Sequence, residues 1–205
     1  MTVRKLAFAC AMLSLSVLVV ATVAGGLTYP GYDHLTQYIS ELGATGAVTG
    51  RGVSMAFIAS GVLLAAFWLL CAILFPRGPL SITGFGLSAL NGLGLMFGGV
   101  FPCDFECSLE NASTSAVLHD VLGGIGYLCG VVGLMLVGMA ARRWPGGRNL
   151  FHLAIVCGAP AAGAIWLIHP AFEWYGAAQR VLEIALAVWT VAVALAVRRP
   201  MVSTA

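Results

Sequence analysis

Long apolar runs alternate with short polar segments along the whole chain. Six of these runs carry few charges and are long enough, as helices, to cross a hydrocarbon core of roughly 30 Å. In chain order they cover residues 6–27, 53–75, 82–101, 115–141, 150–169 and 177–197. The pattern therefore predicts an all-α, polytopic membrane protein with six transmembrane helices in a single domain, residues 1–205.

Composition supports this prediction. Of the 205 residues, 60% are hydrophobic and only 9% are charged, whereas soluble domains carry about 25% charged residues. The first run exceeds the roughly 7–15 residues of a signal-peptide core, so we expect it to be retained as a helix. The net charge is only +2, without a basic run, which argues against a nucleic-acid partner. We expect membrane lipids to be the partners.

The distribution of basic residues predicts the orientation, because Lys and Arg are enriched in short cytoplasmic loops. Most of them fall at the two termini and in the loops after the second and fourth runs. These residues are Arg4, Lys5, Arg77, Arg142, Arg143, Arg148, Arg198 and Arg199. We therefore predict a multi-pass protein of the cell membrane with both termini in the cytoplasm. The outer loops are then residues 31–50, 102–115 and 170–176.

The first of these outer loops contains the polar sequence GYDHLTQYISELGATG, residues 31–46. At about 100° per residue, a helix over residues 33–42 places His34, Gln37 and Glu41 on one face and apolar residues on another. We predict a short amphipathic helix here. His34 and Glu41 are its candidate functional residues on the extracytoplasmic side.

Three histidines, His34, His119 and His169, fall at the predicted outer ends of the helices. Three neutral imidazoles and a water form a common catalytic zinc site, so these residues are candidate metal ligands. A zinc-bound water can attack an ester or amide carbonyl. The sequence thus leads to the hypothesis of a metal-dependent lipid hydrolase or transferase at the outer leaflet.

Other polar residues near the same ends are candidates for the remaining roles. Glu41 or Asp120 would act as the general base, and Ser115 would donate a hydrogen bond to the oxyanion. Arg51 and Arg180 would bind a lipid phosphate. Together with the histidines, these five residues define the candidate site.

The same cluster has a non-enzymatic interpretation. The protein would then be a membrane scaffold or a lipid-binding protein, and the polar side chains would only hold the outer loops in place. A haem held between His119 and His169 is a further alternative. Transport is disfavoured, because the charges leave most of the helices without a polar path through the membrane.

Two of the six cysteines, Cys103 and Cys107, lie in a polar loop. An outer loop that faces an oxidising compartment would allow them to form a local disulfide. Their spacing leaves both a disulfide and two free thiols open.

Several segments of the chain are similar to one family of proteins. These are YDHLTQYISELGA (32–44), GGVFPCD (98–104) and YGAAQRVLE (175–183), together with His119. In this order they resemble the domain of unknown function 998 family of six-helix integral membrane proteins. The resemblance covers nearly the whole chain and implies the same fold.

A weaker likeness is to the membrane hydrolase superfamily of alkaline ceramidases and adiponectin-receptor-like proteins. That superfamily uses a Ser-x-x-x-His pair, an Asp and a later His-x-x-x-His pair around zinc. Ser115 and His119 match the first pair. The second pair differs, because Glu173 stands where a histidine would follow His169.

Overall fold

A computed structural model describes residues 2–198 of the chain. The described part consists of helices, without a strand, and so confirms the predicted all-α class. The α-helices are α1 (Val3–Thr28), α2 (Gly50–Leu74), α3 (Pro79–Val100), α4 (Thr114–Ala141), α5 (Arg148–Ile165) and α6 (Tyr175–Arg198). Two short 3-10 helices are η1 (Ile39–Gly43) and η2 (Phe105–Cys107). Of the basic residues used to predict the orientation, Arg199 lies outside the described residues.

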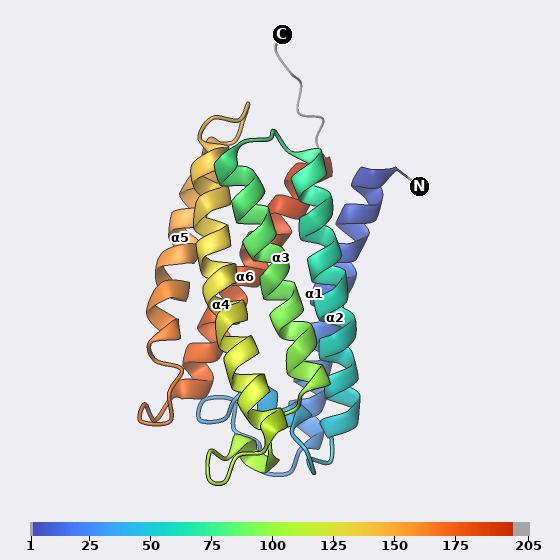
Figure 1. The fold of residues 1–205 in the computed structure, drawn as a ribbon, viewed down its shortest axis with the longest axis vertical. Coiled ribbons are helices and arrows are strands. Elements are labelled where there is room, and N and C mark those ends of the chain that lie inside the picture. Colours follow the sequence, from blue (N-terminus) through green and yellow to red (C-terminus); the bar gives the residue numbers. More distant parts are fainter. Residues whose placement is uncertain (1, 199–205) are drawn as a thin grey trace.

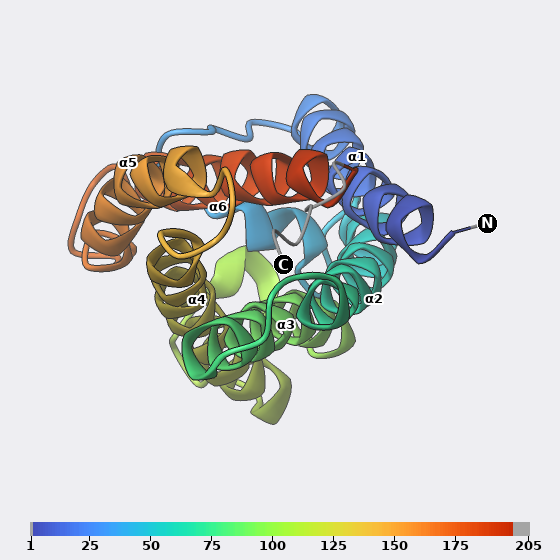
Figure 2. The same cartoon turned by 90° about the horizontal axis from the view of Figure 1, so that it is seen from above.

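The six α-helices form a ring (Figures 1 and 2). Each helix packs against its neighbours in the sequence, and α6 returns to pack against α1. Consecutive helices run in opposite directions, so the start of α1 and the end of α6 lie at the same end of the ring. There a guanidinium nitrogen of Arg4 donates a hydrogen bond to the Val197 carbonyl at 2.8 Å. Figure 2 shows η1 and η2 within the outline of the ring, and both lie at the end opposite the N-terminus.

Charge is divided between the two ends of the ring. The end that holds the start of α1, here called the basic end, carries Arg4, Lys5, Arg77, Arg142, Arg143, Arg148 and Arg198. The opposite end, here called the acidic end, has all eight acidic residues at it or within a few helical turns of it. They are Asp33, Glu41, Asp104, Glu106, Glu110, Asp120, Glu173 and Glu183.

Five of the described α-helices, namely α1, α2, α3, α4 and α6, are long and apolar enough to cross a membrane. The remaining helix, α5, has 18 residues, begins at Arg148 and contains Pro160. The structure thus confirms six α-helices and several candidate spans. A sixth crossing, through α5, stays a prediction.

The predicted amphipathic helix over residues 33–42 is replaced by turns and the shorter η1. The Asp33 carboxylate accepts the Leu35 backbone N–H, and Gln37 Oε1 accepts the Asp33 backbone N–H, both at 2.7 Å. Such side-chain bonds compete with helical backbone bonds and favour turns. Tyr38 then has an extended backbone, with φ −66° and ψ 149°, so the 3-10 helix begins only at Ile39.

Glycines allow α2, α3 and α4 to approach one another closely. A Cβ added at Gly61 of α2 would overlap the α3 backbone at Gly92 and Met96. Between α3 and α4, a Cβ at Gly94 would lie 2.8 Å from the Gly126 Cα. Small residues allow such approaches in lipid, where helix association depends on close packing and not on a hydrophobic gain.

Large side chains fill the basic half of the ring. Phe75, Phe85 and Trp144 form an aromatic cluster there, with the Phe75 ring centroid 4.9 Å from that of Trp144 and 5.4 Å from that of Phe85. Trp68 and Trp189 are also buried in this core. Aromatic side chains thus occupy the interior of the basic half.

The glycine contacts predict a position-specific effect on stability. Gly61→Ala should lower the free energy of unfolding by about 1–3 kcal/mol, the usual range for overpacking, because the added methyl group meets backbone. Gly86→Ala is the matched control, since a Cβ at Gly86 has no atom within 4 Å. The measurement is thermal unfolding in detergent. Equal melting temperatures for the two variants would contradict the close contact between α2 and α3.

Candidate functional site

A cavity of about 670 Å³ lies in the acidic half of the ring. Side chains of α1, α2, α3, α4 and α6 form its walls, and most of that lining is apolar. Leu18, Phe57, Leu95 and Leu186 illustrate this lining. The volume is within the range of roughly 300–1,000 Å³ that is typical of small-molecule sites.

Exposed residues line the cavity on α1 and α6 and also at the acidic end, at Leu109, Asp120 and Pro170, so it opens on the side of the ring between α1 and α6 and toward the acidic end. These helices meet at the basic end, where Arg4 contacts Val197, but α6 is tilted and begins beside α5 at the acidic end (Figures 1 and 2). Val19 and Val23 of α1 and Ile184 of α6 line the cavity. Their side chains are also 58%, 52% and 62% exposed. In a membrane protein this lateral opening faces lipid.

The polar segment between α1 and α2 closes the cavity at the acidic end. Within it, Ile39 and Leu42 are buried, and Ile39 lines the cavity. The Ile39 backbone N–H donates to Gln179 Oε1 of α6 at 2.7 Å. On the other side, the Thr45 backbone N–H donates to the Cys103 carbonyl at 2.8 Å. The segment is therefore tied both to α6 and to the loop before α4.

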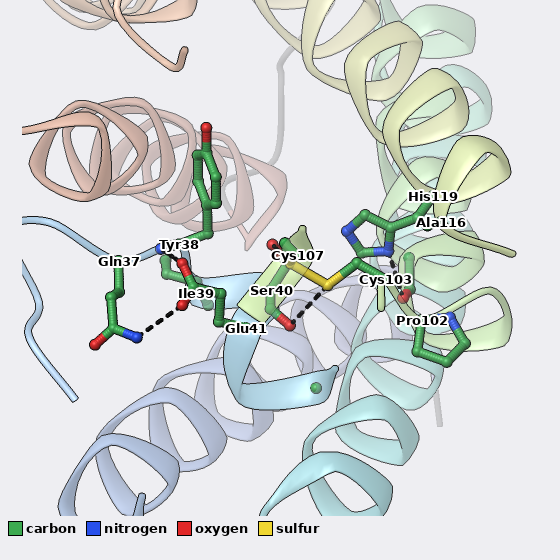
Figure 3. Close-up of a disulfide and its surroundings, with 12 residues drawn as sticks. Gln37, Tyr38, Ile39, Ser40, Glu41, Pro102, Cys103, Cys107, Ala116 and His119 are labelled. Carbon is green, nitrogen blue, oxygen red and sulfur yellow. Dashed lines mark hydrogen bonds between the residues drawn. A yellow bond between two sulfur atoms is a disulfide. The ribbon is translucent and has the colours of Figure 1, made fainter. Parts of the chain in front are cut away.

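A disulfide joins Cys103 and Cys107 beside this segment (Figure 3). Of the two states that the sequence left open, the structure shows the bridge. The Ser40 hydroxyl lies 3.4 Å from Cys107 Sγ and is the donor, because a disulfide sulfur carries no hydrogen. Ser40 and Cys107 both line the cavity, so the disulfide loop forms part of its closed end.

Arg180 makes four hydrogen bonds, three of them to the same segment and one to Gly176 of its own helix. One terminal nitrogen donates to the backbone carbonyls of Gln37 and Gly176, both at 2.9 Å. The other donates to the Tyr32 hydroxyl at 2.7 Å and to His34 Nδ1 at 3.0 Å. Only the Nε–H of the guanidinium is left over. Arg180 is thus first a positioning residue, and none of its four partners is a carboxylate.

Glu41 is 2% exposed and is held within its own segment (Figure 3). Its carboxylate accepts the Tyr38 backbone N–H at 2.8 Å and a Gln37 side-chain N–H at 2.7 Å. Burial raises the pKa of the Glu41 carboxyl group, while these hydrogen bonds act in the opposite direction. The Glu41 side chain is not part of the cavity lining, so it holds the turn before η1 and does not face the cavity.

Ser115 and His119 connect the start of α4 to the end of α3. The Ser115 hydroxyl donates to the Pro102 carbonyl at 2.8 Å. His119 Nδ1 lies 3.1 Å from the Gly98 carbonyl and 2.9 Å from the Phe101 carbonyl. Because both neighbours are acceptors, Nδ1 carries the proton and Nε2 is left as an acceptor. His119 lines the cavity, whereas Ser115 does not.

The other two candidate metal ligands have different environments. His34 lines the cavity and accepts a hydrogen bond from Arg180 through Nδ1. His169 is exposed in the loop before α6, where its Nδ1 accepts the Ala171 backbone N–H at 3.1 Å. Among residues 2–198, no three His, Cys, Asp or Glu side chains are grouped so that they could hold a metal ion. The structure therefore does not bring His34, His119 and His169 together as a zinc site.

The remaining candidates are Asp120 and Arg51. Asp120 follows His119 on α4 and lines the cavity. Arg51 is exposed in the first turn of α2 and is not part of the lining. Of the two arginines expected to bind phosphate, only Arg180 therefore reaches the cavity.

Inside the ring, a chain of hydrogen bonds joins residues that were not among the candidates predicted from the sequence. Gln179 Nε2 donates to the Tyr127 hydroxyl at 3.0 Å, and that hydroxyl donates to Glu183 Oε1 at 2.7 Å. With the bond from Ile39 to Gln179, the chain connects η1 to a carboxylate inside α6. A signal was present, since Gln179 and Glu183 share one face of a largely apolar helix at i and i+4.

These features define a polytopic helical membrane protein with an internal cavity that opens sideways. The sequence profile of the family described as "Protein of unknown function (DUF998)" matches residues 10–196, so the chain belongs to that family. This confirms the family suggested by the polar segments. No curated protein and no solved structure matches the chain. The weaker likeness to the alkaline ceramidase superfamily is not supported.

The bonds of Arg180 predict that its shape, and not only its charge, stabilises the acidic end. Arg180→Lys keeps the charge but replaces the planar group with one ammonium nitrogen, which cannot reach all four partners. We expect the free energy of unfolding to fall by about 1–3 kcal/mol, measured by thermal unfolding in detergent. Arg51→Lys, an exposed change at the same end, should change it by less than about 0.5 kcal/mol. Equal changes in the free energy of unfolding for Arg180→Lys and Arg51→Lys would contradict a stabilising role for the planar guanidinium of Arg180.

Proposed function

We propose that this protein binds a membrane lipid, with the lipid chain inside the ring between α1 and α6. One observation carries the proposal: the cavity of about 670 Å³ is mostly apolar and opens on the lateral surface of a membrane protein. An occupant can therefore enter from the bilayer without crossing water. The network of polar contacts at the acidic end keeps this space from collapsing.

The hydrocarbon chain of the lipid gains little free energy from entering the cavity. A hydrocarbon chain is in an apolar medium both in the bilayer and between apolar side chains, so the hydrophobic effect does not favour either place. Retention then depends on packing and on the polar residues that line the same cavity, such as His119, Asp120, Arg180 and Glu183. This mixture of apolar and polar lining fits an amphipathic occupant.

We propose further that α5 is the sixth crossing. The chain leaves α4 at the basic end and begins α6 at the acidic end, so α5 must run the full length of the ring (Figure 1). Its 18 residues correspond to about 27 Å at 1.5 Å per residue. This length is close to the hydrocarbon thickness of roughly 30 Å.

We propose that the basic end faces the cytoplasm and that the acidic end lies at the outer surface of the cell membrane. The excess of Arg and Lys at the basic end supports this orientation. The Cys103–Cys107 disulfide supports it independently, because disulfides persist in oxidising compartments. The cavity then lies in the outer leaflet of the cell membrane, and both termini lie inside.

Cysteine labelling in intact cells tests this topology. Val48→Cys places an exposed thiol at the acidic end, and Asn149→Cys places one at the basic end. A membrane-impermeant maleimide should label the first without treatment and the second only after permeabilisation. The parent protein, with its native cysteines, is the control. The reverse labelling pattern would contradict the orientation.

No observation favours a hydrolase over a binding protein. The three histidines lie apart, Ser115 donates to a backbone carbonyl, and Glu41 is turned into its own segment. The lipid-binding interpretation needs only the cavity and its opening.

Filling the cavity should remove the lipid. Gly123 lines the cavity, and a Cβ added there meets no atom within 4 Å, so Gly123→Phe can occupy the space without striking backbone. We expect native mass spectrometry to detect phospholipid bound to the parent protein and several-fold less bound to this variant. The matched control is Gly86→Phe, at an exposed glycine of α3 outside the cavity. Unchanged retention in Gly123→Phe, or no lipid on the parent protein, would contradict the proposal.

A further inference from the structure

The polar groups in the cavity wall differ in how much of their hydrogen-bonding capacity the protein uses. Glu183 is the clearest case. Its Oε1 accepts from Tyr127 at 2.7 Å, while no described residue donates to Oε2. Tyr127 cannot add a second bond, because its single proton is already donated and its oxygen accepts from Gln179. Glu183 therefore presents an unused acceptor oxygen in a mostly apolar wall.

His119 adds a second acceptor. Its protonated Nδ1 is directed at the two carbonyls at the end of α3, so Nε2 has a free lone pair. In Figure 3 this second ring nitrogen points away from those carbonyls and toward the interior of the ring. Asp120, the next residue on α4, lines the same cavity, and no described residue donates a hydrogen bond to it.

Charged donors are scarcer in the same wall, although neutral donors such as the Tyr38 hydroxyl and the Asn91 amide also line it. Arg180 uses both terminal nitrogens on the protein, which leaves one N–H. Among the charged side chains of the lining, two carboxylates thus stand against one largely occupied guanidinium. An occupant that complements this wall carries positive charge and several N–H donors. It does not depend on a phosphate for recognition.

Building on the lipid-binding function proposed above, we infer that the occupant is a phospholipid whose headgroup ends in a primary ammonium, as in an ethanolamine phospholipid. The ammonium donates to Glu183 Oε2 and to a further acceptor of the wall. A quaternary choline headgroup has the same charge but no N–H to donate. A glycerol headgroup has hydroxyl donors but leaves the lipid with a net negative charge, which the two carboxylates repel.

The hydrogen bonds inside the ring explain why Glu183 is suited to this role. A carboxylate within a membrane helix needs a partner, and such residues usually mark functional sites. Tyr127 supplies one partner and fixes the orientation of the carboxylate through Gln179, which is itself held by the Ile39 backbone. The free oxygen is therefore held in place before a ligand arrives, which lowers the entropic loss on binding.

The test uses lipids with one identical photoactivatable acyl chain and three headgroups: ethanolamine, choline and glycerol. The purified full-length protein is reconstituted with each lipid at the same low fraction and irradiated. Labelled peptides are then identified by mass spectrometry. We expect the ethanolamine lipid to label cavity residues of α1 and α6 roughly ten-fold more than the other two, the size expected for a hydrogen bond to a charged group.

Two further arms make the result specific. Glu183→Gln should bring labelling by the ethanolamine lipid down to that of the choline lipid, whereas Glu173→Gln, which removes an exposed charge outside the cavity, should leave the ratio unchanged. In the parent protein, lipids with N-methyl and N,N-dimethyl headgroups should label progressively less. This comparison of headgroups uses only the parent protein, so it tests the inference even if Glu183→Gln does not fold.

The outcomes separate this inference from the proposed function. Equal labelling of the cavity by all three lipids would overturn the headgroup inference and leave lipid binding in place. Preference for the glycerol lipid would also overturn it. Absence of labelling in the cavity with every lipid would overturn both the inference and the proposed function.

Discussion

The acidic end of this protein depends on how one polar segment is fastened across an open ring of helices. Arg180 and Gln179 of α6 hold the segment after α1 through its backbone carbonyl at Gln37 and its backbone N–H at Ile39. These bonds satisfy backbone groups near the membrane, where water is limited and an unpaired polar group is unfavourable. They also let α6 begin at a distance from α1. The cavity exists because the two helices are joined there by a polar segment and not by direct packing.

The two halves of the ring therefore have different physical roles. At the basic end, aromatic side chains such as Phe75 and Trp144 fill the interior. At the acidic end, the interior is open and contains the carboxylate of Glu183 with its hydroxyl partner Tyr127. Since lipid chains gain little by leaving the bilayer, these few polar groups determine what the cavity retains.

Much of the fold could be predicted from the apolar runs, because membrane helices are read directly from length and hydropathy. The exceptions have local causes. The fifth helix ends at Ile165, short of the predicted residue 169, as the chain approaches Pro170, which disfavours helix in the residue before it. The polar segment forms turns because the Asp33 carboxylate accepts a hydrogen bond from the nearby Leu35 backbone N–H. The candidate site was predicted less well, because the bonds from Ile39 to Gln179 and from Tyr127 to Glu183 join distant helices. Periodicity within one helix does not show such pairs.

The central claim is that a lipid chain occupies the opening between α1 and α6. An experimental structure of the protein in lipid nanodiscs, at a resolution that shows acyl chains, tests it most directly. We expect elongated density that enters beside Val19 and Ile184 and ends near Glu183. A well-ordered ring in which α1 and α6 close on each other, or in which only water fills this space, would contradict the account.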